Sequence, residues 1–439
     1  GLQSVSLSAN WMWACKNEGE DARLYEAVKG CSDFAIELGI NIPTGKDSLS
    51  MKQKYPNDEV IAPGTVIISA AGNCSNITKV VEPVLQRNGG NIYYLNLSQD
   101  SFKLGGSSFA QVLNKIGNDV PTIQNSEFFK KAFNLLQDLI KDRKIKAGHD
   151  IGSGGLITTL LEMCFADTKL GAFIDLTSLG EKDTVKALFN ENIAVVFQAD
   201  EAVEKEFAAQ NIELFKVGSV VEGDIFTVIN HEDSFTFNPA TLRDNWFKTS
   251  FLLDAKQSKN GMAQERYNNY KNQPLQFTFP AHFDGKLPDI SSGVERPKAA
   301  IIREKGSNSE REMANAMFLA GFDVKDVHMT DLISGRETLE DIQFIGAVGG
   351  FSNSDVLGSA KGWAGAFLYN EKANNALKNF FKREDTLSVG ICNGCQLLME
   401  LELINPEHEI HGKMHHNTSN KHESGFTSVM VQKNNSVML

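Results

Sequence analysis

Hydrophobic positions recur with helix-like and strand-like spacing through the first 240 residues. Apolar residues at helical spacing predict a helix over 21–38, and Gly39 is placed to end it. A short strand over 40–42 should then lead into a turn over 43–45, where Pro and Gly occur close together. The other expected elements are a buried strand at 66–72, strands at 92–97 and 193–199, and helices at 108–116, 128–141, 155–166 and 202–209. This alternation favours an α/β or α+β architecture.

The pattern changes near residue 240 and again near residue 296. Residues 245–270 mix polar and aromatic side chains, which predicts one long surface helix. Residues 273–294 contain three prolines and little periodicity, so we expect an ordered connector and not a flexible Gly/Ser tether. The elements expected beyond the connector are strands at 298–302, 323–328, 344–348 and 387–390, and helices at 310–320, 374–381 and 396–404. Strand–helix repetition with glycines at the strand ends predicts a doubly wound parallel sheet, and 408–439 look β-rich.

Composition limits the classes of function. The 439 residues suggest about three domains at roughly 150 residues each, and 41% hydrophobic content excludes wholesale disorder. A net charge of −12 argues against a nucleic-acid or anionic-membrane partner, because such proteins need positive surface. No apolar run approaches the roughly 18 residues of a membrane span. Six cysteines are too sparse for a disulfide scaffold, so a reducing, cytoplasmic location is expected.

The start of the chain carries no targeting signal that we recognise. Residues 1–4 lack a basic segment, so no signal peptide is expected. They also lack an initiator Met, which suggests a fragment.

The sharpest chemical feature is the sequence GICNGCQ at 390–396. A predicted strand enters it and a predicted helix leaves it, which matches a nucleophile elbow with Cys392 as the nucleophile. Small residues two positions before and after Cys392 would let a strained turn close without a clash. The helix N-terminus would favour the thiolate and direct backbone N–H groups at an oxyanion. A buried Cys at an ordinary strand–helix turn is the plainer alternative.

A zinc site is a second alternative for the same cysteines. Cys392 and Cys395, followed by His411 and His415, fall within a Cys2His2 spacing. A zinc site would leave the glycines around Cys392 unexplained, and the apolar face of 396–404 suits packing on a sheet. We therefore keep a zinc-dependent interaction module as the alternative to an enzyme.

A second glycine-rich turn follows the predicted strand 344–348. Gly349, Gly350, Phe351 and Ser352 would lie at the carboxyl edge of the same sheet as Cys392. Backbone donors there could complete an oxyanion hole with the N–H of Asn393. The turn alone is a weak signal, but the two turns together are much stronger.

These motifs together resemble the formylglycinamide ribonucleotide amidotransferase family, in its large single-chain form. The end of the chain resembles a class I (triad) glutamine amidotransferase domain, and the beginning resembles the synthetase portion. The motifs that carry the resemblance are LSANWMWA at 7–14, GKDSLSM at 45–51, LGGS at 104–107, GGFS at 349–352, DVLG at 355–358, KGWA at 361–364 and GICNGCQ at 390–396.

The resemblance implies a domain order and a fold. Residues 1–60 would end a synthetase N-type subdomain, which is truncated here. Residues 61–240 would form an α/β, α+β-like synthetase C-terminal subdomain, and 241–296 a connector. Residues 297–439 would be the N-terminal part of a glutaminase domain with a doubly wound parallel sheet.

The resemblance also implies an ATP-dependent C–N ligase of purine biosynthesis. Glutamine and formylglycinamide ribonucleotide would be the substrates, with ATP and Mg²⁺ as cofactors and no nucleic-acid or membrane partner. Cys392 would attack the glutamine carboxamide to form a glutamyl thioester and release ammonia. Gly350, Phe351 and Asn393 would stabilise the oxyanion, and Gln396 would belong to the glutamine pocket.

In the synthetase part, the resemblance places Gly45, Lys46 and Ser48 at the nucleotide and substrate phosphates. The spacing is not that of a P-loop, because Asp47 separates Lys46 from Ser48. Asp150 would bind magnesium, and Gly152 stands where the family has a nucleotide-binding Ser. Ser153 replaces a second Asp of the family. Because a hard cation needs several oxygen ligands, a weakened nucleotide–magnesium site is expected.

The resemblance also implies partners that this chain does not carry. The family supplies the base for Cys392 in a downstream His-x-Glu motif, and none of the histidines after Cys392 lies in such a motif. We therefore expect an internal segment that is inactive alone and that needs the N- and C-terminal portions of the same polypeptide. A dedicated amidotransferase subunit would explain the Cys392 turn but not the first 240 residues.

Overall fold

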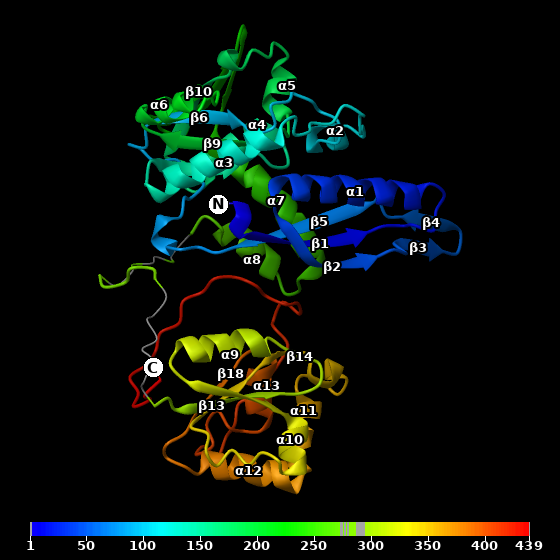
Figure 1. The fold of residues 1–439 in the computed structure, drawn as a ribbon, viewed down its shortest axis with the longest axis vertical. Helices are drawn as coiled ribbons and strands as arrows, with labels where there is room; N and C mark the ends of the chain where they lie inside the picture. The colour runs from blue at the N-terminus through cyan, green and yellow to red at the C-terminus, as the bar shows by residue number, and fades with distance from the viewer. Residues whose placement is uncertain (1, 273–274, 276–277, 279–280, 287–294, 439) are drawn as a thin grey trace. The chain divides into compact units, whose positions relative to one another are not determined.

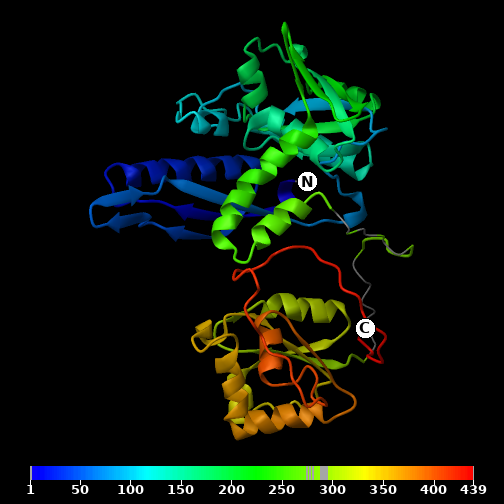
Figure 2. The ribbon, with the colours of Figure 1, turned by 180° about the vertical axis from the view of Figure 1, so that it is seen from behind.

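The structure is a computed structural model that describes residues 2–272, 275, 278, 281–286 and 295–438. It divides into unit 1 (Gly1–Lys256, Ala263–Gln273 and Thr278–Gly285) and unit 2 (Gln257–Met262, Pro274–Phe277 and Lys286–Leu439). Strands and helices alternate in both units, so the predicted mixed α/β class is confirmed (Figures 1 and 2). In the described part of the chain, no helix is long and apolar enough to cross a membrane.

Unit 1 begins with a three-stranded sheet in the order β2-β1-β5. Strand β1 (Val5–Met12) pairs parallel with β2 (Asn41–Ser48) and antiparallel with β5 (Thr65–Gly72). Helix α1 (Glu20–Leu38) connects β1 to β2. A hairpin and two short 3-10 helices complete this part: β3 (Lys52–Tyr55), β4 (Asp58–Ile61), η1 (Leu2–Ser4) and η2 (Ile77–Lys79).

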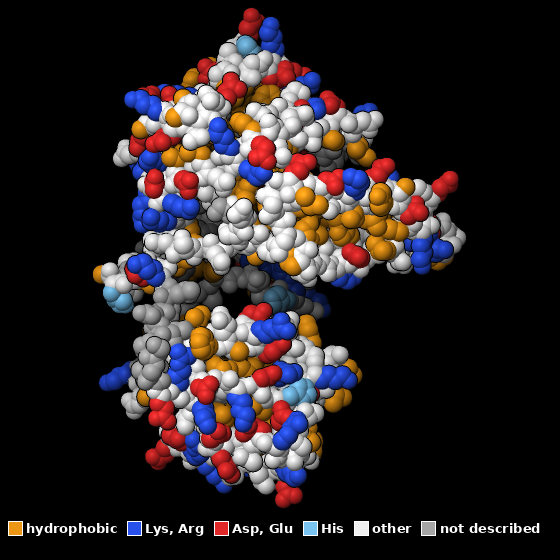
Figure 3. All heavy atoms as spheres, viewed as in Figure 1, with side chains coloured by type: hydrophobic (Ala, Val, Ile, Leu, Met, Phe, Trp, Pro, Cys, Tyr) orange, Lys and Arg blue, Asp and Glu red, His pale blue; other side chains and the backbone are white. Residues whose placement is uncertain are grey.

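Two sequence predictions about this sheet are wrong. Residues 43–45 do not turn, because β2 continues through them and Gly45 pairs with Ala9 of β1. A Cβ added at Gly45 would lie 2.0 Å from the Ala9 carbonyl oxygen, so Gly45 permits a close strand contact. Strand β5 forms as predicted, but all of its residues are exposed. Figure 3 shows hydrophobic side chains gathered over this sheet, and Ile67 is 53% exposed there.

The rest of unit 1 is built on a seven-stranded sheet in the order β12-β11-β8-β10-β6-β9-β7. Strand β6 (Asn91–Asn96), between β10 and β9, sends Ile92 and Tyr94 into one core cluster and Tyr93 and Leu95 into another, because side chains alternate along a strand. The other strands are β7 (Ile145–Asp150), β8 (Leu170–Asp175), β9 (Ala194–Ala199), β10 (Phe215–Glu222), β11 (Phe226–Asn230) and β12 (Asp233–Phe237).

Helices cover both faces of this sheet. Helix α4 (Gly155–Phe165) contributes apolar side chains to the cluster that contains Ile92 and Tyr94. Helices α3 (Ser126–Lys141) and α6 (Ala202–Ala209) contribute to the cluster that contains Tyr93 and Leu95. The shorter helices are α2 (Ser108–Val112), η3 (Thr177–Leu179) and α5 (Thr184–Phe189). The long helix predicted over 245–270 is instead two helices, α7 (Pro239–Gln257) and α8 (Met262–Asn269), with positive φ at Asn260 and Gly261 between them.

Unit 2 contains the predicted parallel sheet. The strands are β13 (Lys298–Arg303), β15 (Asp323–His328), β16 (Phe344–Ala347) and β18 (Leu387–Gly390), in the order β15-β13-β16-β18. The chain crosses from β13 to β15 on one side and then returns to β16 on the other. The sheet therefore has a topological switch point at the carboxyl ends of β13 and β16, where ligands of open α/β sheets bind.

Helices pack on this sheet around a single core cluster. In Figures 1 and 2, α9 (Glu310–Leu319) lies on one side of the sheet and α12 (Glu371–Phe381) on the other. The remaining elements are α10 (Met329–Ser334), α11 (Lys361–Leu368), α13 (Asn393–Glu400), η4 (Ser352–Asp355) and the short strands β14 (Ser307–Asn308) and β17 (Gly349–Gly350).

Two further predictions concern the connector and the end of the chain. The connector over 273–294 falls largely outside the described residues. The β-rich interpretation of 408–439 is wrong over the described residues 408–438, which contain neither strand nor helix.

Truncation of a buried leucine tests the core of unit 1. Leu160 on α4 is 0% exposed, so Leu160→Ala should lower the free energy of unfolding by ~2–5 kcal/mol. Leu253→Ala is the control, because Leu253 on α7 is 61% exposed and its truncation should cost less than ~0.5 kcal/mol. Chemical denaturation measures both, and equal losses would contradict this assignment of the core.

Candidate active site

Three loops meet at the carboxyl ends of the central strands of unit 2. Ile302 of β13 lies opposite Ala347 of β16, which lies opposite Gly390 of β18. The three strands therefore end level with one another. The loop that follows each strand begins at the same carboxyl edge of the sheet. Those loops start at Glu304, at Val348 and at Ile391, so the predicted nucleophile Cys392 lies beside the switch point.

Cys392 occupies a strained backbone conformation. Its φ is 54° and its ψ is −111°, which lies outside the left-handed helical region and is disfavoured for any residue with a Cβ. It is the N-cap of α13, and the N–H of Ile391 before it donates to the Ala347 carbonyl at 3.0 Å. A sharp strand-to-helix turn with an exposed cysteine at its tip is the predicted elbow geometry.

The glycines around Cys392 are needed for this turn to close. A Cβ at Gly394 would lie 2.0 Å from the Ala347 carbonyl oxygen, and one at Gly390 would lie 2.5 Å from the Gly394 carbonyl oxygen. A Cβ at Gly349 would lie 3.2 Å from the Cβ of Cys392 and 3.8 Å from its Sγ. The two glycine-rich turns predicted from the sequence therefore lie against each other at the thiol.

The backbone donors near the thiol are only partly available. Asn393 is in the first turn of α13, where N–H groups have no intrahelical acceptor. The N–H of Phe351, in contrast, donates to the Gly306 carbonyl at 3.0 Å, while the Phe351 side chain is 71% exposed. Gly350 has a φ of 97° and pairs with Ser307 in the β14–β17 ladder. In this conformation Asn393 is better placed than Phe351 to offer an N–H to an oxyanion.

Side-chain contacts join the two turns. Asn393 is buried and bonds to Ser352, Asp355 and Gln396. The sequence predicts that Asn393 and Gln396 belong to the site but indicates no role for Ser352 or Asp355. Both belong to motifs that were visible in the sequence, but a motif does not show which side chains contact each other.

The structure does not favour the zinc alternative. Within the described part of the chain, which includes Cys392, Cys395, His411 and His415, no group of three or more metal-ligating side chains comes together. His411 is instead near Glu402, at 3.7 Å between Nε2 and Oε2.

The predicted synthetase residues lie in two places in unit 1. Lys46 and Ser48 are on β2, where the Lys46 ammonium donates to the Ser48 hydroxyl, and Gly45 contacts the β1 backbone. Asp150 ends β7 with its side chain 86% exposed, and a Cβ at Gly152 would meet no atom within 4 Å. Among the residues that the structure describes, no hydrogen bond or ion pair joins the two groups.

Glu191 is a residue of this region whose role the sequence does not predict. Its Oε1 accepts the N–H of Ser108 at 2.8 Å and the N–H of Gly154 at 2.9 Å. Ser108 opens α2, and Gly154 is the N-cap of α4. A carboxylate of the chain therefore occupies donors at the start of two helices, where an anion is favourable. Nothing in the spacing around Glu191 signals this contact.

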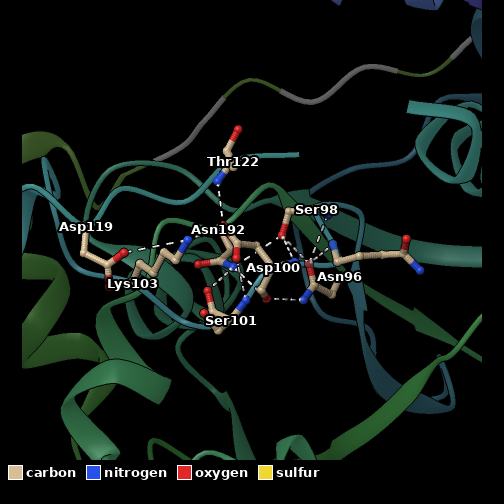
Figure 4. Close-up of polar contacts among 9 residues, drawn as sticks. Asn96, Ser98, Asp100, Ser101, Lys103, Asp119, Thr122 and Asn192 are labelled. Atoms are coloured by element: carbon tan, nitrogen blue, oxygen red, sulfur yellow. Dashed lines mark hydrogen bonds and ion pairs between the residues drawn. The ribbon is translucent and has the colours of Figure 1, made fainter. Parts of the chain in front are cut away.

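A polar network anchors the loop that leads into the LGGS motif (Figure 4). The Asn192 amide donates to the carbonyls of Asp100 and Ser101 at 3.2 and 3.1 Å, and Lys103 donates to the Asp100 carboxylate at 2.9 Å. Burial alone would raise the pKa of Asp100, but hydrogen bonds from Lys103 and from the backbone of Thr122 and Ser101 outweigh it. The pKa of Asp100 therefore lies below its ordinary value.

Comparison with known proteins identifies the relationship. Residues 1–73 match the FGAR-AT PurM_N-like domain, 88–230 the AIR synthase related protein C-terminal domain, and 296–439 the CobB/CobQ-like glutamine amidotransferase domain. The whole chain is 39% identical over 463 aligned residues to an Arabidopsis thaliana protein described as phosphoribosylformylglycinamidine synthase, chloroplastic/mitochondrial. The chain is a homologue of a segment of phosphoribosylformylglycinamidine synthase. It spans 32% of the length of that relative.

Solved structures with some similarity are more distant. T. maritima PurL complexed with FGAR is 14% identical with a TM-score of 0.41, over 55% of this chain and 40% of that chain. Hydrogenase maturation protein HypE in complex with ATP is 14% identical with a TM-score of 0.39, over 54% of this chain and 74% of that chain.

Glycine substitutions test the elbow. Gly394→Ala should lower the free energy of unfolding by ~1–3 kcal/mol, because the new Cβ would overlap the Ala347 carbonyl. Gly365→Ala is the control, because its nearest neighbour is a Tyr369 ring atom at 3.7 Å. Gly365 lies inside α11, so alanine there should be neutral or stabilise by up to ~1 kcal/mol. Thermal or urea unfolding measures both, and a neutral Gly394→Ala would contradict the close approach.

Proposed function

We propose that the chain contributes the glutaminase nucleophile and part of the synthetase site to an enzyme that makes formylglycinamidine ribonucleotide. In the full reaction, formylglycinamide ribonucleotide, glutamine and ATP give formylglycinamidine ribonucleotide, glutamate, ADP and phosphate. The single observation that carries the proposal is the strained Cys392 turn at the switch point of the parallel sheet. Homology over the whole chain to a phosphoribosylformylglycinamidine synthase supports it.

The chemistry assigned to unit 2 is hydrolysis of the glutamine carboxamide. The Cys392 thiolate attacks the carboxamide carbon, and the C–N bond breaks when the amide nitrogen takes up the proton that the thiol gave up, so that ammonia leaves. The resulting glutamyl thioester is then hydrolysed to glutamate, which regenerates the thiol. Negative charge develops on the carbonyl oxygen in both steps. The N–H of Asn393 and the Gly349–Gly350 turn supply the donors that stabilise it.

The chemistry assigned to unit 1 is nucleotide-dependent activation of formylglycinamide ribonucleotide. Lys46 and Ser48 would contact phosphate groups, and Gly45 would keep the β2 backbone close to β1. Asp150, whose side chain is 86% exposed, would supply one carboxylate to Mg²⁺, and a Cβ at Gly152 would meet no atom within 4 Å. Magnesium would neutralise phosphate charge when bound.

A cytoplasmic location stays a prediction from the cysteine content.

The site around Asp150 is proposed to bind nucleotide only weakly. The loop offers one carboxylate where the family has two, and the Gly154 N–H already donates to Glu191. That contact removes a donor that a phosphate would otherwise use at the start of α4.

Cysteine substitution tests the glutaminase proposal. In the protein produced from its complete coding sequence, Cys392→Ala should reduce glutamine hydrolysis by at least ~10³-fold, because no nucleophile remains. Cys395→Ala is the matched control, since it removes a thiol from the same helix, and it should retain activity within about threefold of the original protein. Glutamate release measures both variants. Equal losses together with one bound zinc per chain would instead favour the metal-dependent module.

Restoring the family residues tests the nucleotide proposal. The double variant Gly152→Ser, Ser153→Asp should bind ADP–Mg²⁺ at least roughly tenfold more tightly, because it regains a hydroxyl and a carboxylate. Open space at Gly152 allows the larger side chain. Adding Asp150→Asn to the double variant should reverse the gain. Titration calorimetry measures the affinities, and stoichiometric ADP–Mg²⁺ at this loop in the unaltered protein would contradict the proposed weakness.

A further inference from the structure

The side chain of Asn393 uses all of its hydrogen-bonding capacity inside unit 2, although it directly follows the nucleophile. It is 1% exposed. Its Oδ1 accepts from the Ser352 hydroxyl at 2.6 Å and from the Ser352 N–H at 3.4 Å. Its Nδ2 donates to the two carboxylate oxygens of Asp355 at 3.2 and 3.1 Å and to Gln396 Oε1 at 3.0 Å.

The partners fix the orientation of this amide. A backbone N–H can only donate, so the atom that faces the Ser352 N–H must be the carbonyl oxygen. An ionised carboxylate can only accept, so the atom that faces Asp355 must be the amide nitrogen. Exchanging the two ends of the Asn393 amide would break contacts on both sides. The arrangement therefore requires an amide at position 393 and does not merely tolerate one.

The segment held by Asn393 needs external support. Asn353, Ser354 and Asp355 have φ values of 50°, 56° and 47°, so three successive residues that are not glycine lie in the left-handed region. Such a run is unfavourable for residues with a Cβ. Bonds from Asn393 restrain both of its ends, at Ser352 and at Asp355. The Ala360 N–H adds one more bond to the Asp355 carboxylate, at 3.1 Å.

This restraint reaches the reacting atoms through a short path. Ser352 is 1% exposed and lies two residues after Gly350, and a Cβ added at Gly349 would lie only 3.2 Å from the Cβ of Cys392. Asn393 itself is bonded through the chain to Cys392. A single side chain therefore connects the two turns whose relative position sets the distance between thiol and oxyanion donors.

We propose that Asn393 is a positioning residue for glutamine hydrolysis. Its amide clamps the turn that contains Gly349 and Gly350 against the Cys392 elbow, through Ser352 and Asp355. This proposal rests on the proposed glutaminase function and deepens it. It assigns Asn393 a side-chain role in addition to the backbone N–H that it offers to the oxyanion.

A charge exchange between Asn393 and Asp355 tests the clamp. Asn393→Asp keeps the shape of the side chain but places a second carboxylate against Asp355 and removes both donors. Glutamine hydrolysis should fall by about 100-fold, the scale expected for a misplacement near 1 Å. Adding Asp355→Asn restores one donor and one acceptor across the contact, and activity should recover at least roughly tenfold over the single variant.

Readouts other than activity separate positioning from folding. All variants are made in the protein produced from its complete coding sequence. Iodoacetamide needs only an exposed thiolate, so its reaction with Cys392 should change by less than about twofold in Asn393→Asp. A glutamine-like electrophile needs the assembled pocket, so its reaction with Cys392 should fall with the activity. The matched control is Asn375→Asp, the same change at an exposed position on α12, and it should alter none of these measurements.

The outcomes distinguish the clamp from the function on which it rests. A selective loss that the exchange reverses supports the clamp. Full activity in Asn393→Asp, or no recovery on exchange, overturns the clamp while leaving the glutaminase function intact. A parallel loss of iodoacetamide reaction and thermal stability shows a structural role only and also overturns it. If the unaltered protein neither hydrolyses glutamine nor reacts with the electrophile at Cys392, the function itself fails and the clamp with it.

Discussion

The backbone conformation of Cys392 is the constraint on which the rest of unit 2 depends. A cysteine with φ near 54° and ψ near −111° is unfavourable, so it persists only where the surroundings hold it. The parallel sheet provides that support, because β16 and β18 end level and the Ala347 carbonyl accepts the Ile391 N–H. Glycines at 390 and 394 follow from the same requirement, since a Cβ at either position would overlap the backbone.

The strain has a chemical consequence at the edge of the sheet. It exposes the thiol and points the first turn of α13 toward the same space as the turn at Gly349. The proposed nucleophile and the proposed oxyanion donors then come from two loops that are far apart in sequence. Their relative position is set by the buried contacts of Asn393 with Ser352 and Asp355. In unit 1, by comparison, the Asp150 side chain is exposed and the nearby helix donors contact Glu191, which leaves less for a ligand.

The sequence predicts those parts of the fold that have a strong local signal. The parallel strands of unit 2 and the Cys392 elbow were predictable, because apolar runs and flanking glycines mark both. Strand β7 was not predictable, since the sequence IKAGHD has little periodicity and becomes a strand only by pairing with β9. The opposite error occurs at 428–431, where an apolar run lacks a neighbouring strand. Val429 there is 85% exposed, because a strand needs backbone partners that composition does not supply.

The side-chain contacts of the candidate site could not be predicted from the sequence, for a similar reason. Ser352 and Asp355 stand 41 and 38 positions from Asn393, so their contacts depend on the completed sheet and not on any local pattern. Glu191 joins Ser108 and Gly154 in the same way across 83 and 37 positions. The sequence predicts a turn at Gly45, and only the register of β1 and β2 shows that this glycine lies within a strand against a neighbouring strand.

The central claim is that Cys392 forms a covalent intermediate with glutamine, and mass spectrometry after acid quenching tests it most directly. The protein from its complete coding sequence is mixed with glutamine, quenched during turnover and digested. A glutamyl thioester predicts the mass increment of a glutamyl group on the peptide that contains Cys392, and its loss on treatment with hydroxylamine. Continued glutamine hydrolysis with the increment on another residue, or with no increment under conditions that slow thioester hydrolysis, would contradict the account.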